Sequence, residues 1–341
     1  MSAQLLTSCY ALRRAGGISL VISGLRAVSS PTVWLDQAPL TRDLVGGKGA
    51  SLSQMAALGA PVPPAFAVTA PACATFMSCL GVPDFATVTP AGLPALQARI
   101  LAAPLPADLA AALADGYAAF RDRLGGDVAL AVRSSATTED GSELSFAGQH
   151  DTILGVRTLP ELEDAVRQCW ASLWSERAVA YRQASQPDDV PSMAVVVQQM
   201  IPSDVSFIAF TEDPVGERQG HVVISASWGL GETLVSGLVT PDHVVVAPDG
   251  QVAEYVIGDK QLMIIPDASG SGTREAPVPR LMRSLPALSP AQAAEIAALV
   301  RPLAARLGYA ADLEGAIAGG RVVLFQARPI TTLDGLALAA D

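Results

Sequence analysis

The chain has 341 residues, of which 50% are hydrophobic and 16% are charged, and its formal net charge is −11. This length suits two lobes of ordinary domain size, and the acidic balance disfavours nucleic acid as a partner because phosphate-backbone binding needs a basic surface. The four cysteines show no CxxC spacing, which argues against a zinc site or a disulfide framework. No apolar run approaches the roughly 18 residues of a membrane helix, and we expect a cytoplasmic protein.

Residues 1–31 show little pattern, and we expect an N-terminal extension there, followed by a first lobe over 32–190. Near its start, Gly46-Gly-Lys-Gly49 leads into a predicted helix from Ala50 to Leu58. Glycines allow close backbone approach, a helix N-terminus offers free amides, and Lys48 adds positive charge, so this segment suits phosphate. It lacks the GxxxxGK[ST] spacing of a P-loop. An ordinary glycine turn with a solvated lysine remains the alternative.

In the rest of the first lobe, we predict helices around a short strand. Residues 92–125 predict two helices divided near Pro104 and Pro106, and residues 159–184 predict one more helix. Between them, a strand ending at Arg133 is followed by a hydroxyl-rich loop. Backbone amides in this loop would wrap phosphate, with Arg133 as a bidentate anchor; the loop amides concerned are those around Ser145, Ala147 and Gly148. A polar surface loop is the alternative.

The polar, proline-bearing segment 186–191 marks the expected lobe boundary, and the second lobe, 191–341, is richer in strands. An apolar strand beginning at Met193 ends in four residues that would bind adenine at an inter-lobe crevice: Gln198, Gln199, Met200 and Ile201. Glu232 follows a glycine-bearing strand-to-helix turn and would bind ribose hydroxyls or metal-bound phosphate. Either segment alone is also compatible with a purely structural role. A last helix is predicted over about 290–307.

Two adjacent strands follow, and they carry Glu314, Gln326 and Arg328. Side chains on paired strands share a face only at matching parity. A three-residue loop over 319–321 would place Glu314 opposite Gln326 and Asp312 opposite Arg328, whereas a two-residue Gly-Gly turn would put Glu314 and Gln326 on opposite faces. We therefore predict the three-residue loop. Mg²⁺ prefers oxygen ligands, and one carboxylate with one amide leaves room for water and phosphate oxygens.

The order of these segments is more specific than any one of them. From Val33 to Thr332 the sequence resembles the ATP-binding N-terminal domain of phosphoenolpyruvate synthase, pyruvate phosphate dikinase and rifampicin phosphotransferase, an ATP-grasp domain. The matching words include Val45-Gly-Gly-Lys-Gly-Ala-Ser-Leu, Val132-Arg-Ser-Ser-Ala-Thr-Thr-Glu-Asp, Ser145-Phe-Ala-Gly-Gln, Val197-Gln-Gln-Met, Ala226-Ser-Trp-Gly-Leu-Gly-Glu, Val239-Thr-Pro-Asp, Asp312-Leu-Glu and Gln326-Ala-Arg-Pro-Ile-Thr.

The resemblance implies an α/β (α+β), two-lobed ATP-grasp fold with the nucleotide between the lobes, and ATP and Mg²⁺ as ligands. Lys48, beside Gly47, and Arg133 would bind phosphates. Glu314 and Gln326 would hold magnesium, and Arg328 would contact the transferred phosphoryl group. Three positions depart from the usual pattern: Phe207 stands where glycine is common, Ser225 where Glu or Asn is frequent, and Gly315 where Trp is frequent. Ribose contacts and hinge packing are therefore less securely implied.

In the resembling family, ATP phosphorylates a histidine on a mobile domain and leaves as AMP. The three histidines of this sequence, His150, His221 and His243, do not lie in that domain's Thr-Ser-His-Ala-type motif. We therefore expect the ATP-grasp subunit of a split dikinase, with a second subunit supplying the phosphohistidine and the acceptor site. The arrangement resembles phenylphosphate-synthase-type and cresol-phosphorylating systems, which predicts a phenolic acceptor. Two alternatives stay open: a separated ATP domain acting toward pyruvate or an antibiotic, and a nucleotide sensor without turnover, which an intact Arg328 disfavours.

Overall fold

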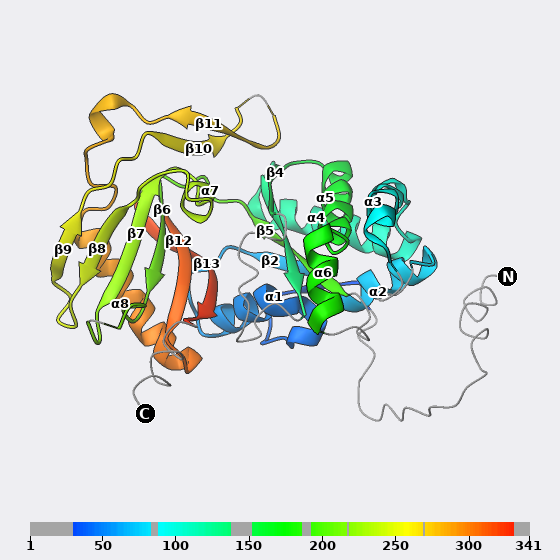
Figure 1. Cartoon of the computed structure of the whole chain (residues 1–341), viewed down its shortest axis with the longest axis horizontal. Coiled ribbons are helices and arrows are strands. Elements are labelled where there is room, and N and C mark those ends of the chain that lie inside the picture. Colours follow the sequence, from blue (N-terminus) through cyan, green and yellow to red (C-terminus); the bar gives the residue numbers. More distant parts are fainter. Residues whose placement is uncertain are drawn as a thin grey trace. The chain divides into compact units, whose positions relative to one another are not determined.

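Two antiparallel sheets and a separate hairpin organise the computed structural model, which describes residues 30–82, 88–137, 152–185, 192–216, 218–268 and 270–330 (Figure 1). The helices are α1 (Arg42–Ala57), α2 (Ala70–Cys79), α3 (Leu93–Ala102), α4 (Ala107–Leu124), α5 (Leu159–Ser172), α6 (Glu176–Ser185), α7 (Glu232–Val235) and α8 (Pro290–Leu307), with short 3₁₀ turns η2 (Pro90–Gly92) and η3 (Arg280–Met282).

The strands of the first sheet are β1 (Thr32–Trp34), β2 (Ala65–Val68), β3 (Leu130–Ala136), β4 (Thr152–Val156) and β5 (Met193–Gln199), in the order β1-β2-β5-β3-β4. Helix α1 packs on one face of this sheet, and α2 and α5 pack on the other. Trp170 and Trp174 are fully buried in the second of these layers. A Thr158–Glu161 capping box starts α5.

The strands of the second sheet are β6 (Val205–Phe210), β7 (Val222–Trp228), β8 (Asp242–Val246), β9 (Val252–Val256), β12 (Ala311–Ala318) and β13 (Arg321–Pro329), in the order β13-β12-β6-β7-β8-β9. Alternate residues along β6 and β7, such as Phe207 and Ile224, face the core that α8 covers. The residues between them face away from α8. The remaining strands, β10 (Leu262–Pro266) and β11 (Thr273–Pro277), form the separate hairpin.

Three details differ from the sequence-based expectations. The expected helix over 159–184 is divided into α5 and α6 at residues 173–175. Helix α1 begins at Arg42, well before Ala50, because it contains two helical pieces joined at a kink at Gly46. Strand β5, which we assigned to the second lobe, pairs with β2 and β3 of the first sheet. The change of sheet therefore comes after Gln199.

The two helices expected between residues 92 and 125 are present as α3 and α4, and the expected last helix is present as α8. Among the described residues, no helix combines the length and apolar character needed to cross a membrane.

Candidate nucleotide-phosphate site

The glycine-rich segment fits closely against the end of β3. Gly46 has φ +69° and ψ 177°, a conformation open to glycine but rare for other residues. A Cβ at Gly46 would also lie 2.0 Å from the carbonyl oxygen of Ser135. The Ser135 hydroxyl donates to the Val45 carbonyl over 2.8 Å and accepts from the Gly49 amide over 3.1 Å. The kink at Gly46 therefore holds the start of the longer helical piece against β3.

Helix α1 also connects the predicted phosphate-binding side chains. The Lys48 ammonium donates to the carbonyl of Ser134 over 3.0 Å, next to Arg133. One turn later, the Ser51 hydroxyl donates to the carbonyl of Ala327 over 2.6 Å, next to Arg328 on β13. The helix thus lies between the strand that carries Arg133 and the strand that carries Arg328. It links three basic residues that are far apart in the sequence.

Arg133 reaches from the first sheet to the second. Its guanidinium lies 3.9 Å from the Glu314 carboxylate and 5.8 Å from the centre of the Phe325 ring. The side chain is 16% exposed, and its Nε has no hydrogen-bond partner among the described residues. Burial lowers the pKa of Arg133, while the negative charges of Glu314 and Glu232 oppose that shift. An arginine stays charged under such a shift, so Arg133 is a fixed cation facing a cluster of carboxylates.

The terminal strands pair as the proposed site requires, although the connecting loop differs from our prediction. Ala318 is opposite Arg321, so the turn contains only Gly319 and Gly320, and the three-residue loop was wrong. A register shift between Glu314 and Gly315 then leaves Phe325 without an opposite residue. Because of this β-bulge, Glu314 and Gln326 share a face of the sheet despite the two-residue turn. Glu314 is opposite Gln326 and Asp312 is opposite Arg328, as predicted.

Asp312 is the acidic partner of Arg328. The Arg328 Nε donates to Asp312 Oδ2 over 2.8 Å. The carboxyl is 7% exposed, and its buried Oδ1 has no hydrogen-bond partner among the described residues. Burial raises the pKa of Asp312, the Arg328 charge lowers it, and nearby Glu314 raises it further. Asp312 therefore holds Arg328 beside the Glu314 carboxylate.

These oxygen atoms fit the chemistry of magnesium. Glu314 and Gln326 share a face of the sheet because they are directly opposite, and Asp312, two residues from Glu314, adds an unpartnered oxygen on the same face. A carboxylate–amide pair with few protein ligands suits Mg²⁺, which usually keeps water and phosphate oxygens in its shell. No group of three His, Cys, Asp or Glu side chains arranged for a metal occurs in the part of the chain that the structure describes. The magnesium assignment stays a prediction.

Glu232 lies at the start of α7, close enough to Arg133 for their charges to interact. Burial raises the pKa of Glu232, while a hydrogen bond from Thr273 and the Arg133 charge lower it. The Thr273 hydroxyl lies 3.3 Å from the carboxylate. This arrangement places Glu232 on the Arg133 side of the second sheet, as a residue contacting ribose or phosphate would have to be.

The predicted adenine segment lies at the end of β5. Gln198 is opposite Ala131 and shares the α1-facing side of the first sheet with Arg133. Its side chain is buried, and its Nε2 has no hydrogen-bond partner among the described residues. Met200 packs in a small apolar cluster with Ala131, Leu230 and Ile264. A buried, unpartnered amide beside an apolar cluster suits a nucleobase.

Some predicted residues cannot be placed. Ser145, Ala147 and Gly148, together with His150, lie outside the described residues. Gly47 lies in α1, Gln199 is the last residue of β5, and Ile201 follows that strand. Sequence reasoning assigned no role to three residues that the structure brings to the site: Asp312, Phe325 and Ser51. Of these three, only Asp312 could have been predicted from the sequence, because it is two residues from Glu314 on the same strand and therefore shares its face.

The two antiparallel sheets, the glycine-bearing helix start and the facing basic and acidic side chains define a nucleotide-binding domain of the two-lobed ATP-grasp type. The chain belongs to the family of the pyruvate phosphate dikinase AMP/ATP-binding domain, whose model matches residues 42–337.

Three proteins of similar sequence support the same assignment. The chain is 40% identical over 290 residues to the prodigiosin synthesizing transferase PigC of Serratia marcescens, covering 84% of this chain and 32% of that protein. It is 36% identical over 305 residues to a probable phosphoenolpyruvate synthase of Methanothermobacter thermautotrophicus, covering 85% and 44%. It is 39% identical over 314 residues to the rifampicin phosphotransferase of Streptomyces sviceus, covering 87% and 35%. The chain therefore spans less than half the length of each of these relatives.

Proposed function

We propose that this chain is the ATP-binding subunit of a split, dikinase-type phosphotransferase. ATP and a histidine on a partner subunit would react to give AMP, phosphate and phosphohistidine, and the phosphohistidine would then phosphorylate a small acceptor. The observation that carries this proposal is the 3.9 Å approach of Arg133, from the first sheet, to Glu314, from the second. This approach supports a polyphosphate position where a fixed cation of the first sheet faces acidic residues of the second.

In this proposal the chain supplies positioning and charge neutralisation, which are the main protein contributions to phosphoryl transfer. Lys48 and Arg133 would bind phosphate oxygens, and Arg328, held by Asp312, would contact the phosphoryl group being transferred. Glu314 and Gln326 would hold a magnesium ion, which neutralises phosphate charge when bound. None of these residues would form a covalent bond to the phosphoryl group.

The bond changes balance with water as the additional reactant. The histidine nitrogen attacks the β-phosphorus of ATP, the bond between that phosphorus and the α–β bridging oxygen breaks, and AMP leaves. Water then releases the γ-phosphate, which leaves one phosphoryl group on the histidine. Transfer to a hydroxyl oxygen regenerates the histidine. We propose a phenolic acceptor, such as phenol or cresol, because of the resemblance to standalone ATP-grasp chains of that type.

The test is to purify the chain together with the products of neighbouring genes and to follow ATP labelled at either the β or the γ phosphate. We expect AMP as the nucleotide product, γ label in free phosphate and β label on a histidine of the partner. Phenol, cresol, pyruvate and rifampicin, added separately, identify the acceptor through loss of label from the partner. Formation of ADP would contradict the dikinase chemistry, and transfer to pyruvate or rifampicin would replace the phenolic assignment.

A further inference from the structure

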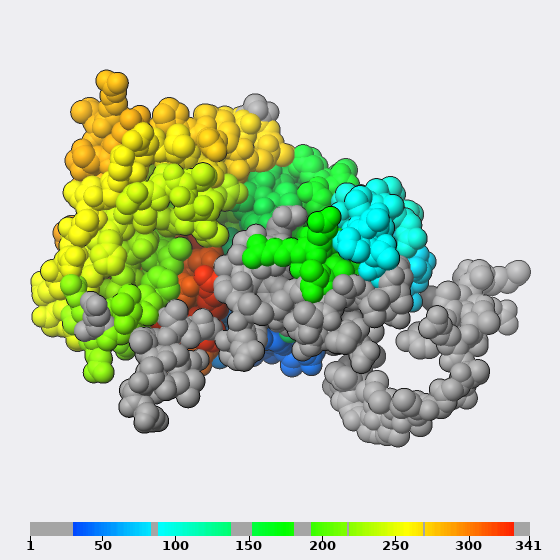
Figure 2. Space-filling view, in the orientation of Figure 1, coloured from blue at the N-terminus to red at the C-terminus, as the bar shows by residue number. Residues whose placement is uncertain are grey.

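The hairpin β10–β11, here called the strap (residues 262–268 and 270–277), reaches from the second sheet to the first. Figure 1 shows it running past α7 toward β4, and in Figure 2 its yellow and orange atoms meet the green surface of the segment that contains β4 and α5. Near its start, the Leu230 amide donates to the Ile264 carbonyl over 2.8 Å. Near its tip, the Gly272 amide donates to the Gly155 carbonyl over 3.2 Å. The strap therefore contacts both sides of the proposed nucleotide site.

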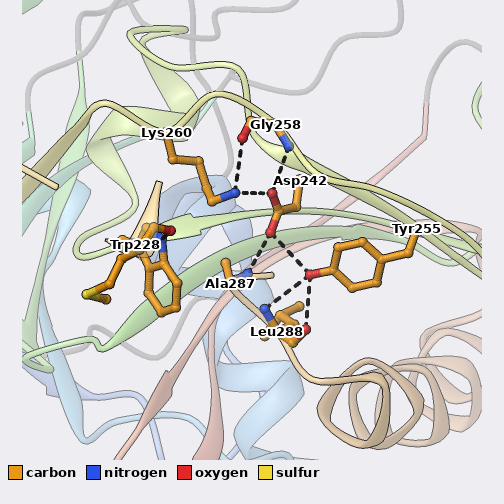
Figure 3. A network of polar contacts seen from close by, with 8 residues as sticks. Trp228, Asp242, Tyr255, Gly258, Lys260, Ala287 and Leu288 are labelled. Carbon is orange, nitrogen blue, oxygen red and sulfur yellow. Dashed lines mark hydrogen bonds and ion pairs between the residues drawn. The ribbon is translucent and has the colours of Figure 1, made fainter. Parts of the chain in front are cut away.

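The root of the strap is held by buried charges (Figure 3). Asp242 and Lys260 form an ion pair with both side chains fully buried. The Asp242 carboxylate also accepts from the Gly258 amide at 2.9 Å, the Ala287 amide at 2.6 Å and the Tyr255 hydroxyl at 3.1 Å. These donors come from the segments before and after the strap, so Asp242 ties both of its ends to β8. Separating buried charges is costly, and this root should stay closed.

Besides the Gly272–Gly155 bond, two exposed hydrogen bonds hold the tip of the strap. The Ser271 hydroxyl donates to Glu161 over 2.6 Å, and the Arg157 Nε donates to the Gly270 carbonyl over 3.2 Å. The Ser271 bond is the largest of the effects that lower the pKa of Glu161. Water can replace exposed hydrogen bonds at little cost, so contacts of this kind open far more often than a buried root.

Gly155 connects the tip to the predicted adenine segment. Its amide donates to the Met200 sulfur over 3.1 Å, and its carbonyl accepts from Gly272. The fit is close, because a Cβ on Gly155 would lie 2.4 Å from the Gly272 nitrogen. A movement of Met200 on nucleotide binding would therefore alter the hydrogen bond between Gly155 and Gly272 at the strap tip.

We propose that the strap is a gate for the nucleotide, anchored at Asp242 and released at its tip, from Gly270 to Gly272, when the nucleotide enters or leaves. This inference uses only ATP binding, which family membership supports, and is independent of the acceptor and of the partner. A gate changes the rates of both entry and exit, whereas a contact made only to the bound nucleotide changes the exit rate and the affinity.

The test is Ser271→Ala in the full chain, with a fluorescent N-methylanthraniloyl derivative of ATP followed by stopped flow. We expect the association and dissociation rate constants each to rise about threefold to tenfold, as loss of one hydrogen bond at the tip would allow, with a nearly unchanged Kd. The control is Thr75→Ala, which removes an exposed hydroxyl bonded within α2, and it should change neither rate constant. Unchanged rate constants in Ser271→Ala, or an increase in the dissociation rate alone, would overturn the gate.

Amide exchange gives a second, independent measurement on the unaltered protein with selectively ¹⁵N-labelled glycine. We expect the Gly272 amide to exchange faster than the Gly258 amide at the root, and to slow when a non-hydrolysable ATP analogue binds. Equal protection of Gly272 with and without the analogue would also overturn the proposal. Failure of the phosphotransfer assay leaves both of these measurements intact.

Discussion

Phe207 of β6 and Gly315 of β12 are direct cross-strand neighbours on the α8-facing side of the second sheet. A Cβ at position 315 would lie 2.4 Å from the Phe207 ring and 2.6 Å from the carbonyl oxygen of Val323. These are two of the three positions where the chain departs from the pattern of the resembling family, which commonly has glycine at the first and tryptophan at the second. The Phe207 ring therefore occupies the space that a side chain at position 315 would need.

This close packing predicts that substitutions at positions 207 and 315 affect stability in a strongly coupled way. Phe207→Gly should cost about 3–5 kcal/mol of unfolding free energy by opening a cavity, and Gly315→Trp about 1–3 kcal/mol or more by overpacking. The double variant should be more stable than the sum of these losses predicts, by at least about 1 kcal/mol. Full recovery is not expected, because the Val323 carbonyl also limits the space. Urea unfolding of the four proteins measures the coupling, and strictly additive losses would show that the positions act independently.

Arg328→Ala should separate nucleotide binding from transfer. The guanidinium lies beside Asp312 at the predicted transfer position, so its loss should lower the rate of partner phosphorylation by a factor of about 100 or more. Binding of ATP should change by no more than about tenfold, because Lys48 and Arg133 remain. Calorimetric titration with ATP and a labelled-ATP transfer assay measure the two effects. Unchanged partner phosphorylation would exclude the role given to Arg328.

Asp312→Asn should change how stability depends on pH. Burial raises the pKa of Asp312 in the folded state, so the folded chain binds this proton more tightly than the unfolded chain. As pH rises from the ordinary range of an aspartate through the raised pKa, ionisation of Asp312 therefore costs stability. The asparagine variant avoids this cost, and its stability relative to the parent should increase as pH rises from the ordinary range of an aspartate through the raised pKa, while transfer falls.

Urea unfolding across this pH range gives the comparison. Asp127→Asn, which changes a carboxylate that is 79% exposed, serves as the matched control and should show no such trend. A relative stability of Asp312→Asn that stays constant or decreases with pH would contradict the prediction.

The buried residues at the root of the strap should tolerate substitution poorly. Lys260→Met leaves the buried Asp242 carboxylate without its cation and should cost about 3–5 kcal/mol. Tyr255→Phe removes one of several donors to Asp242 and should cost only about 1–2 kcal/mol. Burial raises the pKa of Tyr255 well above its ordinary value, so its hydroxyl remains a donor at neutral pH. Thermal and urea unfolding rank the two variants, and a larger loss for Tyr255→Phe would reverse the roles assigned here.

In the terminal hairpin, the sequence predicted the pairing of the site residues but not the turn that joins the strands. Parity arguments identified that Glu314 must be opposite Gln326, and the pairing is confirmed. They failed on the turn because they assumed regular strands, whereas a bulge at Phe325 corrects the register. The bulged Phe325 lies near a residue distant in sequence, because the Arg133 guanidinium is 5.8 Å from the centre of its ring. No local pattern in the hairpin reports that contact.

The sequence by itself determined the local features and the residue chemistry: the helix pattern, the glycine-bearing helix start, and the basic and acidic residues expected around phosphate. These depend on neighbours within a few positions and on motif order. The tertiary structure alone decided that β5 joins the first sheet, that the Phe207 ring packs against Gly315, and that the strap contacts β4 and α5. Each depends on side chains and backbones that are distant along the chain, so their contacts exist only once the sheets have formed.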